Sequence, residues 1–158
     1  MATLAHLIDE YLAGPVAVRK AIAGMSAEQL RTRPVAGKWS TLEVVCHLAD
    51  FDPILADRMK RVIAEERPLL VGADENHFAA ALAYHDRDVE EELTILDKTR
   101  SQLARILRKL PPEALQRVGV HNERGPRTLE QLLTGTISHI PHHLQFVNEK
   151  RKAMGLQV

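Results

Sequence analysis

The clearest helix in the sequence starts at Ser40-Thr41-Leu42-Glu43-Val44-Val45-Cys46-His47-Leu48-Ala49-Asp50. Ser40 and Glu43 have the spacing of a capping box, in which each side chain accepts a hydrogen bond from the backbone amide of the other residue. Apolar side chains then recur at helical spacing, at Leu42, Val45, Leu48, Ala49, Ile54, Leu55, Met59 and Val62. We expect a long helix over residues 39–66, bent near Pro53, that ends before Pro68 because proline disfavours helix at the preceding residue.

Three further segments have the same periodicity, at residues 3–23, 86–110 and 128–154. Gly14-Pro15 predicts a kink or a break in the first of them. The last begins at another capping box, Thr128 and Gln131, and Gly155 is placed to cap its end. Four long amphipathic helices joined by loops predict an all-α protein, a four-helix bundle.

The connecting segments have weaker signals. Residues 26–30 predict a short capped turn of helix. Residues 68–84 fit either a long loop or a loop that contains a short helix at 73–83. Residues 117–127 alternate weakly between apolar and polar and contain Gly119, Gly125 and Pro126, so they fit a loop or a small hairpin.

Composition narrows the class of protein. The 158 residues fit one domain, 1–158, with 45% apolar and 27% charged residues, the balance of a soluble globular chain. The 21 basic residues balance the 21 acidic ones, so the chain lacks the excess of positive charge that is typical of nucleic-acid-binding proteins. Cys46 is the single cysteine, which excludes an intrachain disulfide and suits a reducing compartment.

The location is predicted from two further features. No apolar run approaches the roughly 20 residues that a membrane-spanning helix needs, so we expect no membrane partner. Asp9 and Glu10 come too early for the apolar core of a signal peptide. We therefore expect a cytoplasmic protein.

Three histidines form the candidate functional site. His139 and His143 are four residues apart, so on a helix their Cβ atoms lie about 6 Å apart on one face. If that helix lies beside the one that carries His47, three imidazoles can bind one cation and leave coordination positions open, as catalytic zinc sites do. Imidazole also suits nickel, iron(II) and copper(II). The same spacing equally fits one core-facing and one solvated histidine, and the absence of HExxH argues against a zincin protease.

Other residues near His47 have two interpretations each. Asp50 can orient a ligand or a metal-bound water, or it can be a solvated helix position. Cys46 points about 100° away from His47 on the helix, and a lone cysteine is usually a small buried hydrophobe. Arg58 lies three turns after His47 on the same face and can meet an anionic substrate, or it belongs to a solvated charged face.

The remaining histidines are expected elsewhere. His142 lies about 100° around the helix from His143, so we expect it to be exposed or hydrogen-bonded away from the site. His77, His85 and His121 fall in or beside the connecting segments. One of them can approach the open side of a metal, but each is expected at the surface.

The motif around His47, followed about ninety residues later by His139-Ile140-Pro141-His142-His143-Leu144-Gln145, resembles the DinB/YfiT-like superfamily. The resemblance covers nearly the whole chain, in helix order. It implies an up-down-down-up four-helix bundle with a long crossover and a divalent metal held by three histidines. By position these are His47, His139 and His143. It also implies a homodimer.

The family suggests the reaction class. Characterised relatives include S-transferases and isomerases that depend on low-molecular-weight thiols, and metal-dependent hydrolases. We therefore expect zinc or nickel and metal-dependent transfer or hydrolysis on a small molecule, with thiol-dependent S-transfer placed ahead of hydrolysis. The alternative is a non-enzymatic metal-binding protein, related to stress or serving as a scaffold.

Overall fold

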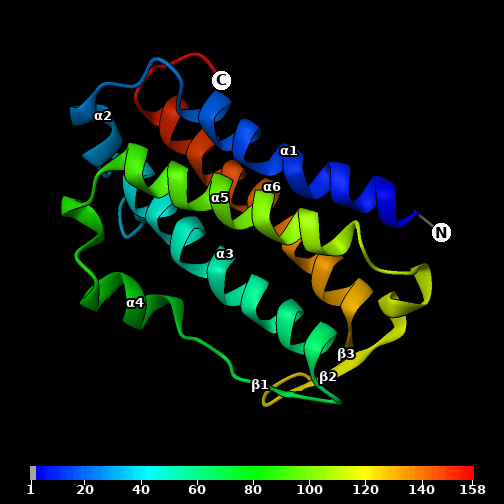
Figure 1. Ribbon diagram of the computed structural model, residues 1–158. Helices are drawn as coiled ribbons and strands as arrows, with labels where there is room; N and C mark the ends of the chain where they lie inside the picture. Colours follow the sequence, from blue (N-terminus) through cyan, green and yellow to red (C-terminus); the bar gives the residue numbers. More distant parts are fainter. Residues whose placement is uncertain (1–2) are drawn as a thin grey trace.

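Four long helices form the body of the protein, for which a computed structural model describes residues 3–158 (Figure 1). They are α1 (Leu4–Ile22), α3 (Thr41–Ala64), α5 (Val89–Leu107) and α6 (Leu129–Ala153). Helices α1 and α6 run in one direction, and α3 and α5 run in the other (Figure 1). Each of these two helix pairs packs against the other, α1 on α5 and α3 on α6, so the predicted up-down-down-up bundle is confirmed.

The connection between α3 and α5 is long because these two helices are parallel, so the chain has to return along the whole bundle (Figure 1). This crossover contains β1 (Leu69–Leu70), α4 (Glu75–Ala81) and a 3-10 turn, η1 (Tyr84–Asp86). Of the two predictions for residues 68–84, the one with a short helix is therefore confirmed, although β1 was not expected. The shorter link between α1 and α3 contains α2 (Ala27–Arg31).

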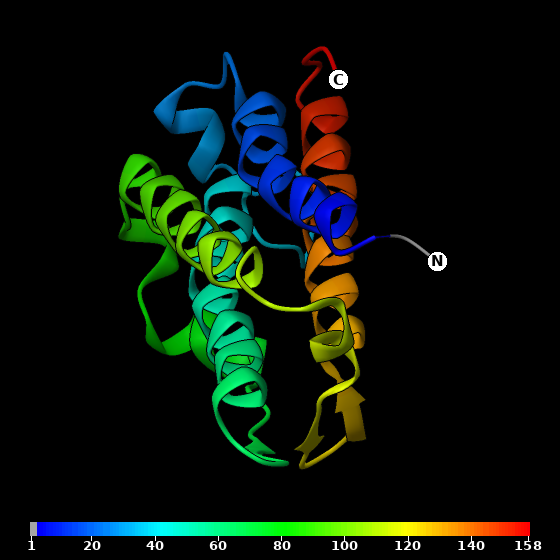
Figure 2. The ribbon, with the colours of Figure 1, turned by 45° about the vertical axis from the view of Figure 1, so that its right-hand side comes forward.

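A small sheet closes the end of the bundle where α6 begins (Figure 2). After η2 (Pro112–Gln116), β2 (Val118–His121) and β3 (Gly125–Thr128) form an antiparallel hairpin, and β1 pairs in parallel with β2. A Cβ atom on Gly119 would lie 2.8 Å from side-chain carbons of both Leu70 and Val62. Glycine thus allows the hairpin to lie close against β1 and α3.

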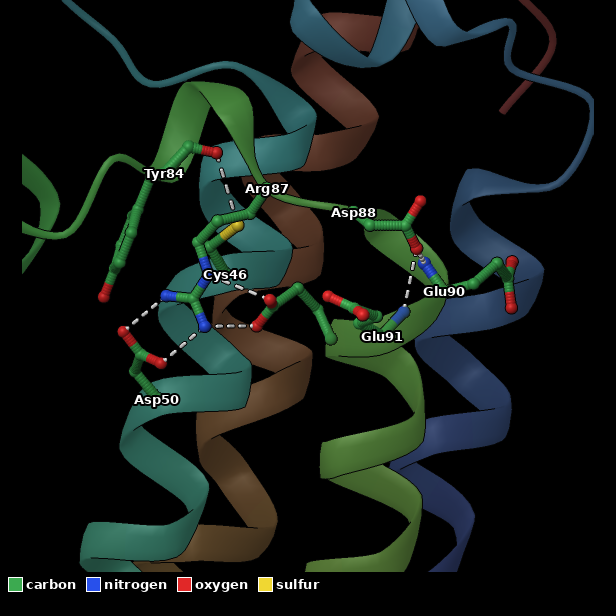
Figure 3. Close-up of polar contacts among 8 residues, drawn as sticks. Cys46, Asp50, Tyr84, Arg87, Asp88, Glu90 and Glu91 are labelled. Atoms are coloured by element: carbon green, nitrogen blue, oxygen red, sulfur yellow. Dashed lines mark hydrogen bonds and ion pairs between the residues drawn. The ribbon is translucent and has the colours of Figure 1, made fainter.

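The helix starts follow from their caps. The Ser40 hydroxyl accepts from the Glu43 amide at 3.1 Å, and the Glu43 carboxylate accepts from the Ser40 amide at 2.6 Å. The capping boxes expected at Ser26 and Thr128 are also present. Helix α5 begins later than expected, because the Asp88 carboxylate caps the amides of Glu90 and Glu91 (Figure 3).

The helix break allowed for at Gly14-Pro15 does not occur, since α1 continues through both residues. Proline lacks the N–H group that would bond to the carbonyl of Tyr11, four residues earlier. The Arg100 guanidinium supplies the missing donor, with Nη1 at 2.8 Å from that carbonyl oxygen. A Cβ atom on Gly14 would lie 2.3 Å from this Nη1, so glycine provides the space for the arginine.

The core consists of two apolar clusters between the helices. One contains Ile8, Met59 and Leu103 and lies next to β1 through Leu70. The other contains Val18, Leu42 and Leu96, among others. Within residues 3–158, none of the helices combines the length and the hydropathy that crossing a bilayer would require.

Candidate metal centre

The three predicted histidines meet between two helices. His47 lies on α3, and His139 and His143 lie one turn apart on α6. The Nε2 atom of His47 is 3.1 Å from Nε2 of His139 and 3.1 Å from Nε2 of His143. A set of ligand atoms, one from each residue, lies within 4.8 Å of one another. The spatial convergence expected from the sequence is therefore present.

Local structure explains this convergence. The capping box at Ser40 fixes where α3 begins and hence which residues of α3 are buried, including His47. On α6, His143 is buried while Pro141, between the two histidines, is exposed. The proline thus lies away from the site, and α6 continues through it.

Burial keeps the three imidazoles neutral. His47 is fully buried and His143 is 7% exposed. Loss of solvent, followed by repulsion from the other two imidazoles, lowers the pKa of His47 to about 3. Burial, followed by repulsion from His143, lowers the pKa of His139 to about 3. Burial, followed by repulsion from His142, lowers the pKa of His143 to about 4. At neutral pH all three are in the uncharged form that binds metals.

The arrangement fits a divalent cation. A zinc–nitrogen bond is about 2.0–2.1 Å, so two imidazole nitrogens on a tetrahedral ion are about 3.3 Å apart, close to the separations in the triad. The Nδ1 atoms of all three rings are buried and have no hydrogen-bond partner within residues 3–158. The Nε2 atoms of His139 and His143 both lie 3.1 Å from that of His47, so these three nitrogens are the ones close enough to share an ion, and imidazole donors suit zinc or nickel.

A fourth side chain approaches this centre from the crossover. Glu75 is the first residue of α4, and its Oε2 atom is 3.9 Å from Nε2 of His47. The Glu75 side chain is 52% exposed, so it faces both the triad and solvent. The sequence did not indicate this residue, because no periodicity showed where the crossover would lie.

Glu75 and two histidines of the triad, His139 and His143, line a cavity of about 770 Å³. Its walls come from α3, α6, the start of α4 and the β2–β3 hairpin. Phe51 and Phe146 line it near the histidines, and Arg58, Arg124 and Arg127 line it at the hairpin. The cavity has the size of a small-molecule site.

Asp50 was considered as a residue that orients a ligand or a metal-bound water, but its partner is Arg87. Its carboxylate accepts two hydrogen bonds from the Arg87 guanidinium, at 2.8 and 2.9 Å, and Arg87 also donates to Glu92 (Figure 3). The Nδ1 atoms of the triad have no partner, so Asp50 orients none of these rings by a hydrogen bond. Instead it ties the end of the crossover to α3.

Cys46 is the buried hydrophobe that the sequence indicated. Its Sγ atom lies 3.4 Å from the Tyr84 carbonyl oxygen, to which it donates (Figure 3). Burial, with the nearby Glu92 carboxylate next in importance, raises the pKa of the Cys46 thiol to about 12. The thiol is therefore protonated at neutral pH and is no nucleophile.

The other histidines divide into two groups. His77, His85 and His142 are exposed, as expected, although His142 also borders the cavity. The expectation for His121 was wrong: it is 5% exposed and lines the cavity from β2. Pairing of β2 with β1 buries this residue, and that pairing had no signal in the sequence.

The fold and the site together define an up-down-down-up helical bundle with a buried three-histidine cluster. The DinB superfamily model matches residues 11–147, and this chain belongs to that superfamily.

Individual relatives agree with this assignment. A Bacillus licheniformis protein named "Putative metal-dependent hydrolase" is 29% identical over 149 residues, which cover 94% of this chain and 85% of the relative. YuaE of Bacillus subtilis, described as uncharacterized, is 30% identical over 140 residues, or 81% of this chain and 86% of YuaE. The solved structure of YfiT from Bacillus subtilis superimposes with a TM-score of 0.90 at 26% identity, covering 98% of this chain and 89% of YfiT. YfiT is described as "a probable metal-dependent hydrolase with an unusual four-helix bundle topology".

Proposed function

We propose that this protein is a metal-dependent hydrolase of small molecules, with zinc or nickel held by Nε2 of His47, His139 and His143. The observation that carries the proposal is the convergence of three neutral imidazoles in a cavity, with the Glu75 carboxylate 3.9 Å from His47. When bound, such a cation lowers the pKa of a bound water or thiol and polarises a substrate oxygen. The names of the relatives from Bacillus licheniformis and Bacillus subtilis support the same reaction class.

Glu75 is the general base in this proposal. A carboxylate at this position can accept a proton at Oε2 from the attacking water and return it to the leaving group. The aromatic rings of Phe51 and Trp39 lie against His47, with ring centroids at 4.4 and 5.4 Å. They hold the imidazole in place and exclude water from behind it.

Thiol-dependent S-transfer is the second candidate. The only thiol of the chain, on Cys46, is buried and protonated, so the nucleophilic sulfur would have to come from a low-molecular-weight thiol. A cavity of about 770 Å³ has room for such a thiol beside an acceptor. The same open cavity argues against the non-enzymatic alternative, for which side chains would be expected to fill the space above the metal.

The ligand assignment is tested by replacing single histidines. We expect His47→Ala to lose stoichiometric zinc or nickel, measured by elemental analysis, while circular dichroism shows unchanged helicity. The matched control is His77→Ala, because the His77 side chain is 86% exposed and its ion-pair partner is Asp74, which is not one of the proposed ligands. Full metal retention by His47→Ala would reject the assignment.

The reaction class is tested with the metal-loaded protein. A panel of nitrophenyl esters reports hydrolysis, and conjugation of cysteine to chlorodinitrobenzene reports S-transfer. Glu75→Gln should keep the metal and lose roughly 10²- to 10⁴-fold in hydrolysis, the usual contribution of a general base. The control is Glu113→Gln, an exposed residue of η2. Conjugation without hydrolysis, unaffected by Glu75→Gln, would replace the hydrolase with the transferase; no turnover in either assay would favour the non-enzymatic alternative.

A further inference from the structure

The end of the cavity away from the triad is lined by three arginines from three different elements. Arg58 lies on α3, Arg124 lies in the turn between β2 and β3, and Arg127 lies on β3. Arg58 follows His47 by eleven residues, which places it on the same face of α3 and about 16 Å further along the helix axis. The cavity therefore connects the histidines to a separate cationic region.

Arg58 is held in place by the crossover, and all three arginines keep free donors. Nε and Nη2 of Arg58 both donate to the Val71 carbonyl oxygen, at 3.2 and 2.7 Å, which fixes its guanidinium beside the crossover. Arg127 is paired through its backbone with Gly119, but across the part of the chain that the structure describes the guanidinium groups of Arg124 and Arg127 form no hydrogen bond and no ion pair. Their guanidinium groups remain available to a molecule in the cavity.

The carboxylates that line the cavity leave this end positively charged. Asp74 uses its carboxylate to cap α4, by accepting from the amides of Asn76 and His77, and Glu75 lies beside the triad. Glu123 is thus the one acidic side chain at the hairpin end of the lining within residues 3–158, against three arginines.

The basic groups at this end of the cavity lie close enough to affect one another's ionisation. Burial, followed by the charge of Arg124, lowers the pKa of Arg58. Burial, followed by the charges of Arg58 and Arg124, lowers the pKa of His121, which lines the same end. Clustered cations in a partly buried cavity attract an anion, because the walls reduce solvent screening.

We propose that Arg58, Arg124 and Arg127 form a subsite for an anionic group, a carboxylate or a phosphate, on the small molecule that reacts at the histidines. Guanidinium groups bind both anions through paired, charge-assisted hydrogen bonds. The substrate would extend along α3, with its anion at the hairpin and its reacting bond beside Glu75. This role as a substrate subsite rests on the proposed function, whereas anion binding itself does not.

The test measures anion binding by isothermal titration calorimetry with two probes, inorganic phosphate and glutarate, at low salt. We expect the wild-type protein to bind at least one probe, with affinity that decreases as sodium chloride is added. The variant R124Q/R127Q should bind at least tenfold more weakly, the size expected for losing charge-assisted hydrogen bonds. The control is R105Q, which removes an exposed arginine from α5. Tighter binding of phosphate than of glutarate would identify a phosphate-bearing substrate, and the reverse would identify a carboxylate.

Anion binding at the metal is separated by repeating the titration with metal-free protein and with H47A. Binding that persists in both and is lost in R124Q/R127Q supports the arginine subsite, even if the hydrolase proposal fails. Binding that requires the metal, or that R124Q/R127Q leaves unchanged, overturns it. Circular dichroism and metal content should be the same in R124Q/R127Q as in wild type, because neither guanidinium group has a hydrogen-bond or ion-pair partner among residues 3–158.

Discussion

At the scale of single residues, Gly14 and Pro15 show how two unfavourable helix residues are accommodated. Proline removes one backbone hydrogen bond, and the Arg100 guanidinium replaces it by donating to the Tyr11 carbonyl. Glycine makes this possible, because any Cβ atom at position 14 would overlap Arg100 and Ile140. Sequence periodicity cannot predict such a contact, since Arg100 is distant in the chain and its target is a carbonyl group.

We predict that Gly14→Ala destabilises the protein by about 2–3 kcal/mol, as overpacking of a core does. The matched control is Gly135→Ala on α6, where an added Cβ atom would have no neighbour within 4 Å. Because alanine favours helix over glycine, that control should stabilise by up to about 1 kcal/mol. Urea unfolding of both variants measures the difference, and equal stabilities would contradict the role assigned to Gly14.

The lowered pKa values of the triad predict how metal binding depends on pH. Above about pH 5 the imidazoles of His47, His139 and His143 are already neutral, so protons do not compete for Nε2. We expect zinc affinity to be nearly constant between about pH 5 and 6.5. Each imidazole of ordinary pKa would instead lower the zinc affinity by more than about tenfold between about pH 6.5 and pH 5. Competition with a chromogenic chelator at several pH values measures this. A steep fall below pH 6.5 would show that the rings are charged in the metal-free protein.

The site residues differ in how far they could be predicted. The spacing of His139 and His143, with His47 on another amphipathic helix, was enough to propose the triad. Glu75 could not be found this way, because its place depends on the path of the crossover. Asp50 had the right spacing on α3, but Arg87 of the crossover binds it instead.

At the scale of elements, the capping boxes at Ser26, Ser40 and Thr128 located three helix starts correctly. Their signal is local, since it depends on residues three positions apart. The hairpin of β2 and β3 was one of the two alternatives for residues 117–127, but β1 has no comparable signal, because it has two residues and its pairing with β2 joins segments about fifty residues apart. Burial of His121 depends on that pairing, so the expectation of a surface histidine was wrong for the same reason.

We predict that Ser40→Ala destabilises the protein by about 1–2 kcal/mol, the upper part of the range for losing an N-cap. Ser40 is buried and caps the helix that carries His47, so the Glu43 amide would be left without its partner. Ser26→Ala removes an equivalent but exposed cap from the five-residue helix α2 and should cost less. Chemical denaturation of the two variants compares them; a larger loss for Ser26→Ala would contradict this ranking.

At the scale of the whole molecule, Arg100 connects all four long helices. From α5 it binds the Asp52 carboxylate on α3 at 2.7 Å, the Tyr11 carbonyl on α1 and the Thr136 carbonyl on α6. Arg100 and Asp52 are both about 1% exposed. A buried ion pair adds little net stability, but it allows only one arrangement of the groups around it.

We predict that Arg100→Met destabilises the protein by about 3–5 kcal/mol, because it leaves the Asp52 carboxylate buried without a partner. Adding Asp52→Asn removes that charge, so the double variant should recover part of the loss. Thermal and urea unfolding of wild type, Arg100→Met, Asp52→Asn and the double variant give the comparison. Strictly additive losses would show that the two residues do not act as a pair.

The homodimer and the cytoplasmic location stay predictions. Light scattering of the purified protein tests the first, and fractionation of cells that express the chain tests the second. Neither affects the triad, whose three ligand atoms come from one chain.

The parallel direction of α3 and α5 determines which segment of this fold can vary among relatives. Because these two neighbouring helices point the same way, the crossover between them runs the length of the bundle. The crossover supplies Glu75 and the Val71 carbonyl group that orients Arg58. Insertions or substitutions in the crossover can therefore change the cavity wall near Glu75 while the four long helices and their histidines stay the same. Variation in the crossover would thus change the acid–base group separately from the arginine subsite, which lies on α3 and the hairpin.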